Sequence, residues 1–285
     1  MNFLLSKKLP ANTRYYKAEI ADGGALGLFY AEGYNRNPRM DDLVKLACFY
    51  ATRNEKLRIW RMNDAQRKVT YLNVGLGCSS TTSVMADDTL SFHASVFSRM
   101  LSTATTQESP DMKGMLAISS LDENNGFPII NTEYIEVPAF DVLNCKAGSG
   151  WEVRLMGGIK EKLLHNCKRN APKETGGVLI GIANYKTKTI HVFDIVSEPQ
   201  GSHGTCCGFV RGAQGLPDAI EGIKKATGDV IGYIGEWHTH PMNLKRLSEK
   251  DEETIVELME LNRIVPIPTC ALIVTPDELL VYIYE

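Results

Sequence analysis

The chain has 285 residues, of which 44% are hydrophobic and 23% are charged, and its formal net charge is -3. This composition is typical of a globular protein with one large domain or two modest ones. Because no basic excess is present, nucleic acid is not expected as a partner.

Neither a targeting segment nor a membrane span is evident in the sequence. The apolar run Phe3–Leu5 is too short for the core of a signal peptide, and no apolar run approaches the roughly 20 residues of a spanning helix. The seven cysteines include no Cys-x-x-Cys pair, which argues against a disulfide framework and a zinc knuckle. We therefore expect a cytoplasmic protein with no membrane partner.

A small flexible run, KAGSG at residues 146–150, lies between two patterned regions. Such a run of small residues is typical of a linker and predicts a domain boundary. We expect an α+β N-terminal domain over residues 1–147 and a second domain over residues 151–285.

Both regions combine helices and strands. Apolar residues at helical spacing predict helices, and β-branched or uniformly apolar runs predict strands. The expected helices cover residues 41–53, 89–101 and 156–168, a segment after Pro217 and a segment after Ser248. The expected strands cover residues 68–77, 176–196 with a turn inside it, 228–240, and a hairpin over 270–285 that turns at Pro276-Asp277. This order predicts an α/β protein with a mixed sheet and helices packed on it.

The segment from His238 to Asp251 carries the strongest chemical signal. His238 and His240 are two residues apart, so on a strand their imidazoles point to the same face. Pro241 ends the strand because it cannot donate to the ladder, and a short loop then brings Asp251 into the first turn of the next helix. Two imidazoles and one carboxylate are a set of protein ligands typical of a catalytic zinc site, which leaves one position for water.

Each of these residues also has an ordinary structural explanation. A lone His-x-His pair often fills a surface or core position, and Ser248 with Asp251 matches a simple helix N-cap. Glu174, which precedes Thr175-Gly176-Gly177, would by itself be a surface turn residue. The combination of His-x-His-Pro, six residues and Ser-x-x-Asp is expected by chance in roughly a few of a hundred thousand chains of this length. The combination therefore favours the metal hypothesis.

The whole pattern is similar to that of the JAMM metalloproteases, also called the JAB or MPN family. That family has an upstream glutamate, then His-x-His, ten residues and an aspartate, with a serine three positions before the aspartate. All five positions are present, and Pro241–Lys250 are the ten intervening residues. The segments ETGGVLIG at 174–181 and GYIGEWHTHP at 232–241 also resemble the family. The resemblance covers about residues 151–285.

The resemblance implies a role for each residue of the pattern. His238, His240 and Asp251 would ligate one zinc ion. Glu174 would accept a proton from the attacking water and pass it to the leaving amine, and Ser248 would donate a hydrogen bond to the oxyanion. Family members cleave isopeptide or peptide bonds after the C-terminal glycine of ubiquitin or ubiquitin-like proteins. The implied activity is deconjugation or precursor processing.

The polyubiquitin-specific branch of the family carries inserts, in one case with a second zinc, but no histidine follows His240 here. The region resembles the bacterial members, which serve ubiquitin-like conjugation systems. The implied partners are a ubiquitin-like protein or its conjugates, and enzymes of the activating or conjugating type. Two alternatives stay open: an MPN scaffold that binds a ubiquitin-like protein or its activating enzyme without cutting, and a zinc hydrolase of small amides.

The N-terminal region gives a weaker signal. Residues 71–101 resemble the C-terminal part of ThiF-like adenylation domains, but G-x-G-x-x-G is absent and Gly75-Leu76-Gly77-Cys78 lacks the third glycine. Adenylation by this chain alone is therefore not expected, and Cys78 is interpreted as a buried small residue or a relic of thiol chemistry. We expect a docking module or the remnant of a larger activating enzyme.

A second group of residues invites a metal hypothesis, because His203, Cys206 and Cys207 lie close together in GSHGTCCGFVRG. Adjacent side chains diverge on a strand, which argues against joint ligation. We therefore expect a loop beside the groove with semi-buried thiols. His165 near a helix end and His191 in a strand are expected to be structural.

Overall fold

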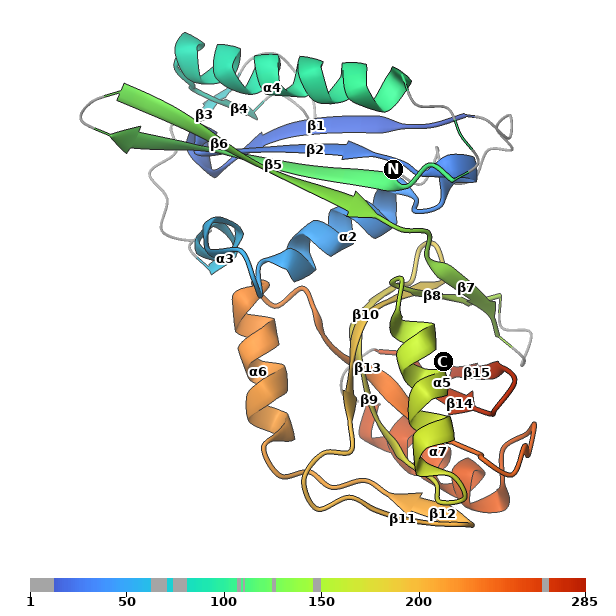
Figure 1. Ribbon diagram of the computed structural model, residues 1–285. Coiled ribbons are helices and arrows are strands. Elements are labelled where there is room, and N and C mark those ends of the chain that lie inside the picture. Colours follow the sequence, from blue (N-terminus) through green and yellow to red (C-terminus); the bar gives the residue numbers. More distant parts are fainter. Residues whose placement is uncertain are drawn as a thin grey trace. The chain divides into compact units, whose positions relative to one another are not determined.

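The computed structural model describes residues 13–62, 71–73, 81–106, 109, 111–124, 127–145, 150–262 and 267–285. The protein separates into two compact units, and the division along the chain falls between Ala139 and Phe140. The short segment Ala226–Gly228 is grouped with the first unit. Each unit is built on a sheet of its own (Figure 1).

The first unit contains a four-stranded antiparallel sheet in the order β1-β2-β5-β6. Its strands are β1 (Tyr16–Ala21), β2 (Leu26–Ala31), β5 (Gly114–Asn124) and β6 (Phe127–Val137). The other elements are η1 (Asp22–Gly24), η2 (Tyr34–Arg36), α2 (Met40–Tyr50), α3 (Glu55–Met62), the short pair β3 (Tyr71–Asn73) and β4 (Thr81–Ser83), and α4 (Asp87–Thr106). Helices α2 and α4 cover opposite faces of the sheet (Figure 1).

Strand β2 shows why both faces of this sheet are covered. Phe29 and Ala31 pack in one apolar cluster with Ala104 of α4. Leu28 and Tyr30, the alternate residues, point to the other face and are as deeply buried. A strand that is apolar on both sides needs a helix on each side.

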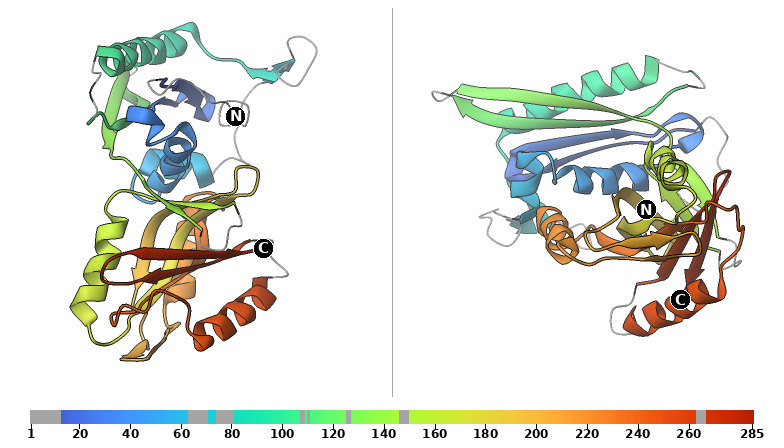
Figure 2. Two further views of the ribbon diagram at one scale, coloured as in Figure 1. Left: turned by 90° about the vertical axis from the view of Figure 1, so that its right-hand side faces the viewer. Right: turned by 60° about the horizontal axis from the view of Figure 1, so that its bottom comes forward.

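The second unit contains a seven-stranded mixed sheet in the order β15-β14-β13-β9-β10-β8-β7. The strands are β7 (Asp141–Asn144), β8 (Glu152–Leu155), β9 (Gly176–Asn184), β10 (Thr189–Ser197), β13 (Gly232–Thr239), β14 (Thr269–Val274) and β15 (Leu279–Tyr284). A separate hairpin of β11 (His203–Thr205) and β12 (Gly208–Val210) follows β10. The helices are α5 (Ile159–Asn170), α6 (Leu216–Ala226) and α7 (Glu249–Asn262), and Figure 2 shows the sheet from two further sides.

The division between the units corrects the expected boundary at residues 147–151. Strands β7 and β8 pair antiparallel, with Asp141 opposite Leu155, so the chain on both sides of residues 146–149 belongs to one sheet. The glycine-containing run therefore lies between paired strands and does not separate the units. Residues 146–149 themselves lie outside the described residues.

The α/β class and the mixed sheet are confirmed, and the expected helices correspond to α2, α4, α5, α6 and α7. The expected strand–turn–strand is the pair β9 and β10, the buried strand is β13, and the C-terminal hairpin is β14 and β15. Of the expected strand 68–77, only Tyr71–Asn73 falls within the described residues. None of the helices that the structure describes is both long and apolar enough to cross a membrane.

The core of the second unit lies where α5 packs on the sheet. Ile159 and Leu163 of α5 contact the same buried cluster as Leu179 of β9 and Trp237 of β13. Strand β9 can approach β10 closely because two of its three glycines, Gly177 and Gly181, lie against the β10 backbone. A Cβ atom on Gly181 would lie 1.9 Å from the carbonyl oxygen of His191, which is part of the backbone.

We predict that Gly181→Ala lowers the free energy of unfolding by about 1–3 kcal/mol, because the new methyl group overpacks a backbone contact. The matched control is Gly222→Ala in α6, where nothing lies within 4 Å of an added Cβ atom. That control should stabilise the protein by roughly 0.5–1 kcal/mol through helix propensity. Urea denaturation of both variants measures the difference, and an equal effect at the two positions would contradict the packing argument.

Candidate metal centre

The C-terminal end of β13 positions the two histidines. His238 lies within the sheet, opposite Gly176 of β9 and Ile273 of β14. His240 follows the strand, and its amide still donates to the carbonyl of Val274 at 2.8 Å. Because the two residues alternate with Thr239, both imidazoles point to one face, and their Nε2 atoms lie 3.1 Å apart.

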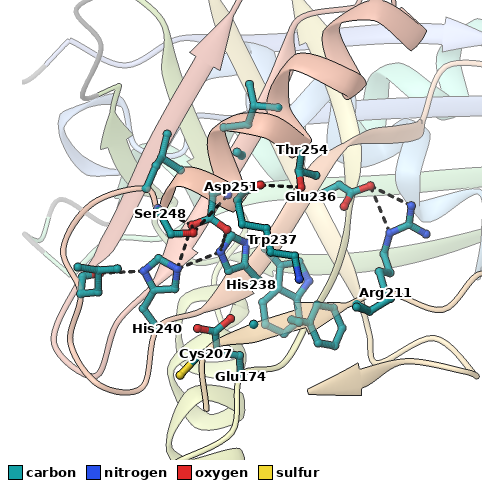
Figure 3. A pocket seen from close by; sticks show the side chains of 18 of the residues that line it. Glu174, Cys207, Arg211, Glu236, Trp237, His238, His240, Ser248, Asp251 and Thr254 are labelled. Carbon is teal, nitrogen blue, oxygen red and sulfur yellow. Dashed lines mark hydrogen bonds and ion pairs between the residues drawn. The ribbon is translucent and has the colours of Figure 1, made fainter. Parts of the chain in front are cut away.

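The first turn of α7 positions the carboxylate. Asp251 accepts hydrogen bonds from the amide and the hydroxyl of Ser248, both at 2.7 Å, and its own amide donates to Ser248 Oγ at 3.2 Å. This reciprocal arrangement is a helix N-terminal cap and fixes the side chain of Asp251. The two carboxylate oxygens then lie 3.0 Å from His238 Nε2 and 3.3 Å from His240 Nε2. The cap and the cluster of three side chains therefore share one carboxylate (Figure 3).

The tautomer of neutral His240 follows from its second nitrogen. Nδ1 lies 2.9 Å from the carbonyl oxygen of Leu244, which can only accept, so Nδ1 carries the proton. Nε2 of the neutral ring then presents a lone pair toward Asp251. A fixed Nδ1–H donor and a free Nε2 lone pair are the usual arrangement of a metal-ligating histidine.

The charges at the centre favour a cation. Burial alone would raise the pKa of Asp251, but hydrogen bonds from His238 and from His240 in its protonated form outweigh burial and hold it well below its usual range. Burial alone would lower the pKa of His240, but its bonds to Asp251 and to the Leu244 carbonyl outweigh burial and raise it above 6.5. The centre therefore attracts positive charge. One ligand atom from each of His238, His240 and Asp251 lies within 4.8 Å of the others, so the three can hold a metal ion.

Glu174 approaches this centre from the start of β9. Its amide donates to the carbonyl of Thr205 at 2.7 Å. The next residue, Thr175, exchanges two hydrogen bonds with Thr239: one from its amide to Thr239 Oγ1 at 2.9 Å and one to its carbonyl from the Thr239 amide at 2.8 Å. Burial raises the pKa of the Glu174 carboxyl above 4.5. The carboxyl group faces the histidines but is not part of the ligand trio (Figure 3).

The centre lies in a cleft of about 780 Å³. Its apolar lining includes Trp237 and Ile255 from the core, and its rim carries the exposed side chains Val210, Met242 and Leu261. Away from the histidines, Arg211 forms an ion pair of 2.9 Å with Glu236. The cleft therefore combines an apolar wall with a polar reactive end, as ligand sites commonly do.

The structure brings all five residues of the sequence pattern, Glu174, His238, His240, Ser248 and Asp251, to this one cleft. The other histidines lie elsewhere: buried His93 on α4, His165 on α5, buried His191 on β10 and exposed His203 on β11. Cys206 and Cys207 lie beside the cleft as expected, but the expectation of semi-buried, diverging thiols is wrong. They occupy the turn between β11 and β12, both are exposed, and their sulfur atoms are 3.3 Å apart.

A model of the prokaryotic homologs of the JAB domain matches residues 158–282, a segment that contains all five of these residues. The C-terminal half of the chain contains a JAB domain. A protein of Enterobacter hormaechei subsp. hoffmannii (strain UCI 50) named CD-NTase/cGAS isopeptidase is 30% identical over 101 residues, or 35% of this chain. That match covers 54% of the relative, so the chain spans about half of the relative's length.

Among solved structures, the solution structure of protein DSY2949 from Desulfitobacterium hafniense is similar to this chain. It is 16% identical, and the match covers 45% of this chain and 79% of that one, with a TM-score of 0.29. A score of this size supports no conclusion about the fold. The assignment of the JAB domain therefore depends on the family match and on the Enterobacter relative.

Sequence reasoning did not identify Thr239 or the Leu244 carbonyl as parts of the site. A backbone carbonyl leaves no signal in a sequence, because every residue has one. Thr239 does leave a signal. It lies between two histidines that face the cleft, so its side chain must point to the opposite, buried face, where a hydroxyl needs a partner.

We predict that Thr239→Val lowers the free energy of unfolding by about 1–3 kcal/mol, because the buried amide of Thr175 loses its acceptor. Thr239 and Thr175 are 0% and 1% exposed, so water cannot replace the hydroxyl. Thr254→Val is the matched control, since Thr254 is an exposed residue of α7 whose hydroxyl donates to the Lys250 carbonyl of the same helix. Denaturant unfolding of the two variants should separate them, and equal stabilities would contradict the role of Thr239.

Proposed function

We propose that the JAB domain is a zinc-dependent isopeptidase or peptidase that cleaves after the C-terminal glycine of a ubiquitin-like protein. The observation that carries this proposal is the convergence of His238, His240 and Asp251 on one point beside Glu174. The isopeptidase name of the Enterobacter relative supports the same reaction class.

The spacing of the three side chains fits zinc. Zinc binds nitrogen and oxygen at roughly 2.0–2.2 Å in a tetrahedron, which places neighbouring ligand atoms about 3.3 Å apart. The separations of 3.1 Å between the two imidazoles and of 3.0 and 3.3 Å to the carboxylate are close to that value. His238, His240 and Asp251 would hold the ion, and when bound it supplies a Lewis acid that lowers the pKa of water to roughly 7.

The residues around the centre would perform the proton transfers. Glu174 would accept the proton of the attacking water and deliver it to the leaving amine, and its raised pKa suits a group that must do both. Ser248 would donate its hydroxyl to the oxyanion. In the structure that hydroxyl donates to Asp251, but the Ser248 amide donates to the same oxygen, so the hydroxyl can turn away without releasing the carboxylate.

Two other functions have less support. A scaffold that binds a ubiquitin-like protein without cutting does not need a complete ligand trio beside a partly buried glutamate, and both are present. A zinc hydrolase of small amides would need the same centre, but a cleft of about 780 Å³ that opens past exposed apolar residues accommodates a polypeptide segment. A tail that ends in glycine suits the approach to the centre, because glycine lets its backbone come close.

For the first unit, we propose a docking role. Residues 71–101 resemble the C-terminal part of ThiF-like adenylation domains, and a module of that origin could bind an activating or conjugating enzyme of the same system. A docking module raises the local concentration of substrate at the peptidase cleft without new contacts at the centre.

We predict near-stoichiometric zinc in the purified full-length protein and the loss of most of it in His240→Ala, because only two ligands then remain. His203→Ala is the matched control: His203 lies on the exposed hairpin outside the trio and should keep the metal. Metal analysis by mass spectrometry is the measurement. Retention of zinc by a His238→Ala, His240→Ala double variant would refute the proposed ligands.

We predict that Glu174→Gln keeps its zinc and loses turnover by roughly a hundredfold to ten-thousandfold, since loss of a general base has that effect. The substrate is ubiquitin, or a ubiquitin-like protein from the same system, with a fluorogenic amide on its C-terminal glycine. Glu253→Gln, at an exposed position of α7, controls for the change of charge. Loss of metal in Glu174→Gln would make Glu174 a ligand, and full activity would require another base.

A further inference from the structure

Two adjacent thiols occupy the turn of the β11–β12 hairpin. Thr205 and Gly208 are the last paired residues, so Cys206 and Cys207 form the turn itself. Both side chains are exposed, and their sulfur atoms lie 3.3 Å apart. Cysteine is among the residue types most often buried, so two exposed neighbours that face each other are unusual.

The same hairpin is hydrogen-bonded to the backbone of Glu174 and packs against it. The Glu174 amide donates to the carbonyl of Thr205, the residue just before the thiols, at 2.7 Å. Gly204 packs so closely that a Cβ atom there would lie 1.9 Å from the Glu174 carbonyl oxygen. Both thiols line the cleft, and Cys207 lies beside Glu174 (Figure 3). A change in the turn is therefore transmitted to the backbone of Glu174.

We propose that Cys206 and Cys207 form a redox-sensitive modification site, in which a peroxide converts the two thiols into a disulfide and displaces Glu174. The modification and the displacement are independent of the proposed function. Their effect on catalysis rests on that function, because it assigns the proton transfer to Glu174.

The reaction balances with hydrogen peroxide as the oxidant. One thiolate attacks a peroxide oxygen, the O–O bond breaks, and a sulfenic acid and hydroxide form. The neighbouring thiol then attacks the sulfenic sulfur and releases water, so two thiols and one peroxide give one disulfide and two waters. The hydrogen bond between the two thiols raises the pKa of Cys207. Because the thiolate is the reactive form, the reaction should accelerate as the pH rises.

The resulting disulfide should be easy to reduce. Adjacent Cα atoms are about 3.8 Å apart, whereas disulfides usually join Cα atoms roughly 4.4–6.8 Å apart. A disulfide between neighbours therefore strains the turn, and strained, exposed disulfides belong to the labile class. Both the displacement of the turn and its reversal by a thiol follow from this constraint.

The other cysteines that the structure describes are less accessible. Cys48, Cys167 and Cys270 are buried, and burial raises the pKa of each of their thiols. Cys145 is half-buried in the segment after β7. Among the cysteines within the described residues, oxidation at low peroxide should therefore select the hairpin pair.

The test begins with full-length protein treated with hydrogen peroxide, blocked with N-ethylmaleimide and digested with trypsin. The peptide from residue 189 to Arg211 contains Cys206 and Cys207 as its only cysteines. We expect this peptide to carry no N-ethylmaleimide and to be lighter by two hydrogen atoms than the reduced peptide. After reduction with dithiothreitol, its two thiols should react with N-ethylmaleimide. Hydrogen–deuterium exchange should show faster exchange of the Glu174 amide in the oxidised protein and recovery after reduction.

Variants separate the pair from the rest of the chain. Cys206→Ser and Cys207→Ser should lose the exchange response to peroxide, and Cys145→Ser should keep it. If the proposed function holds, peroxide should lower turnover of the fluorogenic amide on the order of a hundredfold in the wild type, as misplacement of a catalytic group does. Peroxide should not change the turnover of Cys206→Ser or of Cys207→Ser relative to the same variant without peroxide.

Several outcomes would overturn the proposal. The first is that N-ethylmaleimide still blocks both thiols after peroxide treatment. The second is a sulfinic acid, or a disulfide to a third cysteine, in place of the internal disulfide. The third is an internal disulfide with an unchanged exchange rate of the Glu174 amide. An inactive wild type would count against the proposed function alone, because the peptide mass and the amide exchange do not depend on turnover.

Discussion

The carboxylate of Asp251 is the interaction on which the candidate centre depends. It contacts both imidazoles and caps α7 through Ser248, so one side chain joins the end of β13 to the start of the helix. Its side chain is only 15% exposed, and a second carboxylate, Glu174, lies nearby. Two carboxylates against neutral imidazoles leave excess negative charge in a partly buried site, which a divalent cation would neutralise.

The rest of the JAB domain holds the other groups in register with that carboxylate. Strand β13 is an interior strand of the sheet, with β9 and β14 on either side, so His238 is fixed by neighbours on both sides. Thr175 is held to β13 by its two hydrogen bonds with Thr239, and Glu174 is the residue directly before it. The proposed proton carrier and the proposed metal ligands, which come from distant parts of the sequence, thus share one rigid support, as preorganised catalysis would require.

The sequence predicted how these side chains are placed better than it predicted the organisation of the chain. His238 and His240 could be placed on one face because the strand period is two, and Asp251 could be placed in a helix start because Ser248 precedes it by three. The prediction of a boundary at 146–150 was wrong because a glycine-containing run has the same composition in a linker between domains as in a connection between paired strands. The orientation of Cys206 and Cys207 failed because the tight hairpin was not evident from three-residue strands, and adjacent side chains converge in a turn but not on a strand.

The central claim is that His238, His240 and Asp251 form one metal site. Anomalous diffraction from crystals of the zinc-loaded protein, recorded on both sides of the zinc absorption edge, tests this claim most directly. The account predicts one strong peak about 2.0–2.2 Å from both Nε2 atoms and from a carboxylate oxygen of Asp251. A peak at the exposed thiols of Cys206 and Cys207, or none within bonding distance of the three side chains, would contradict it.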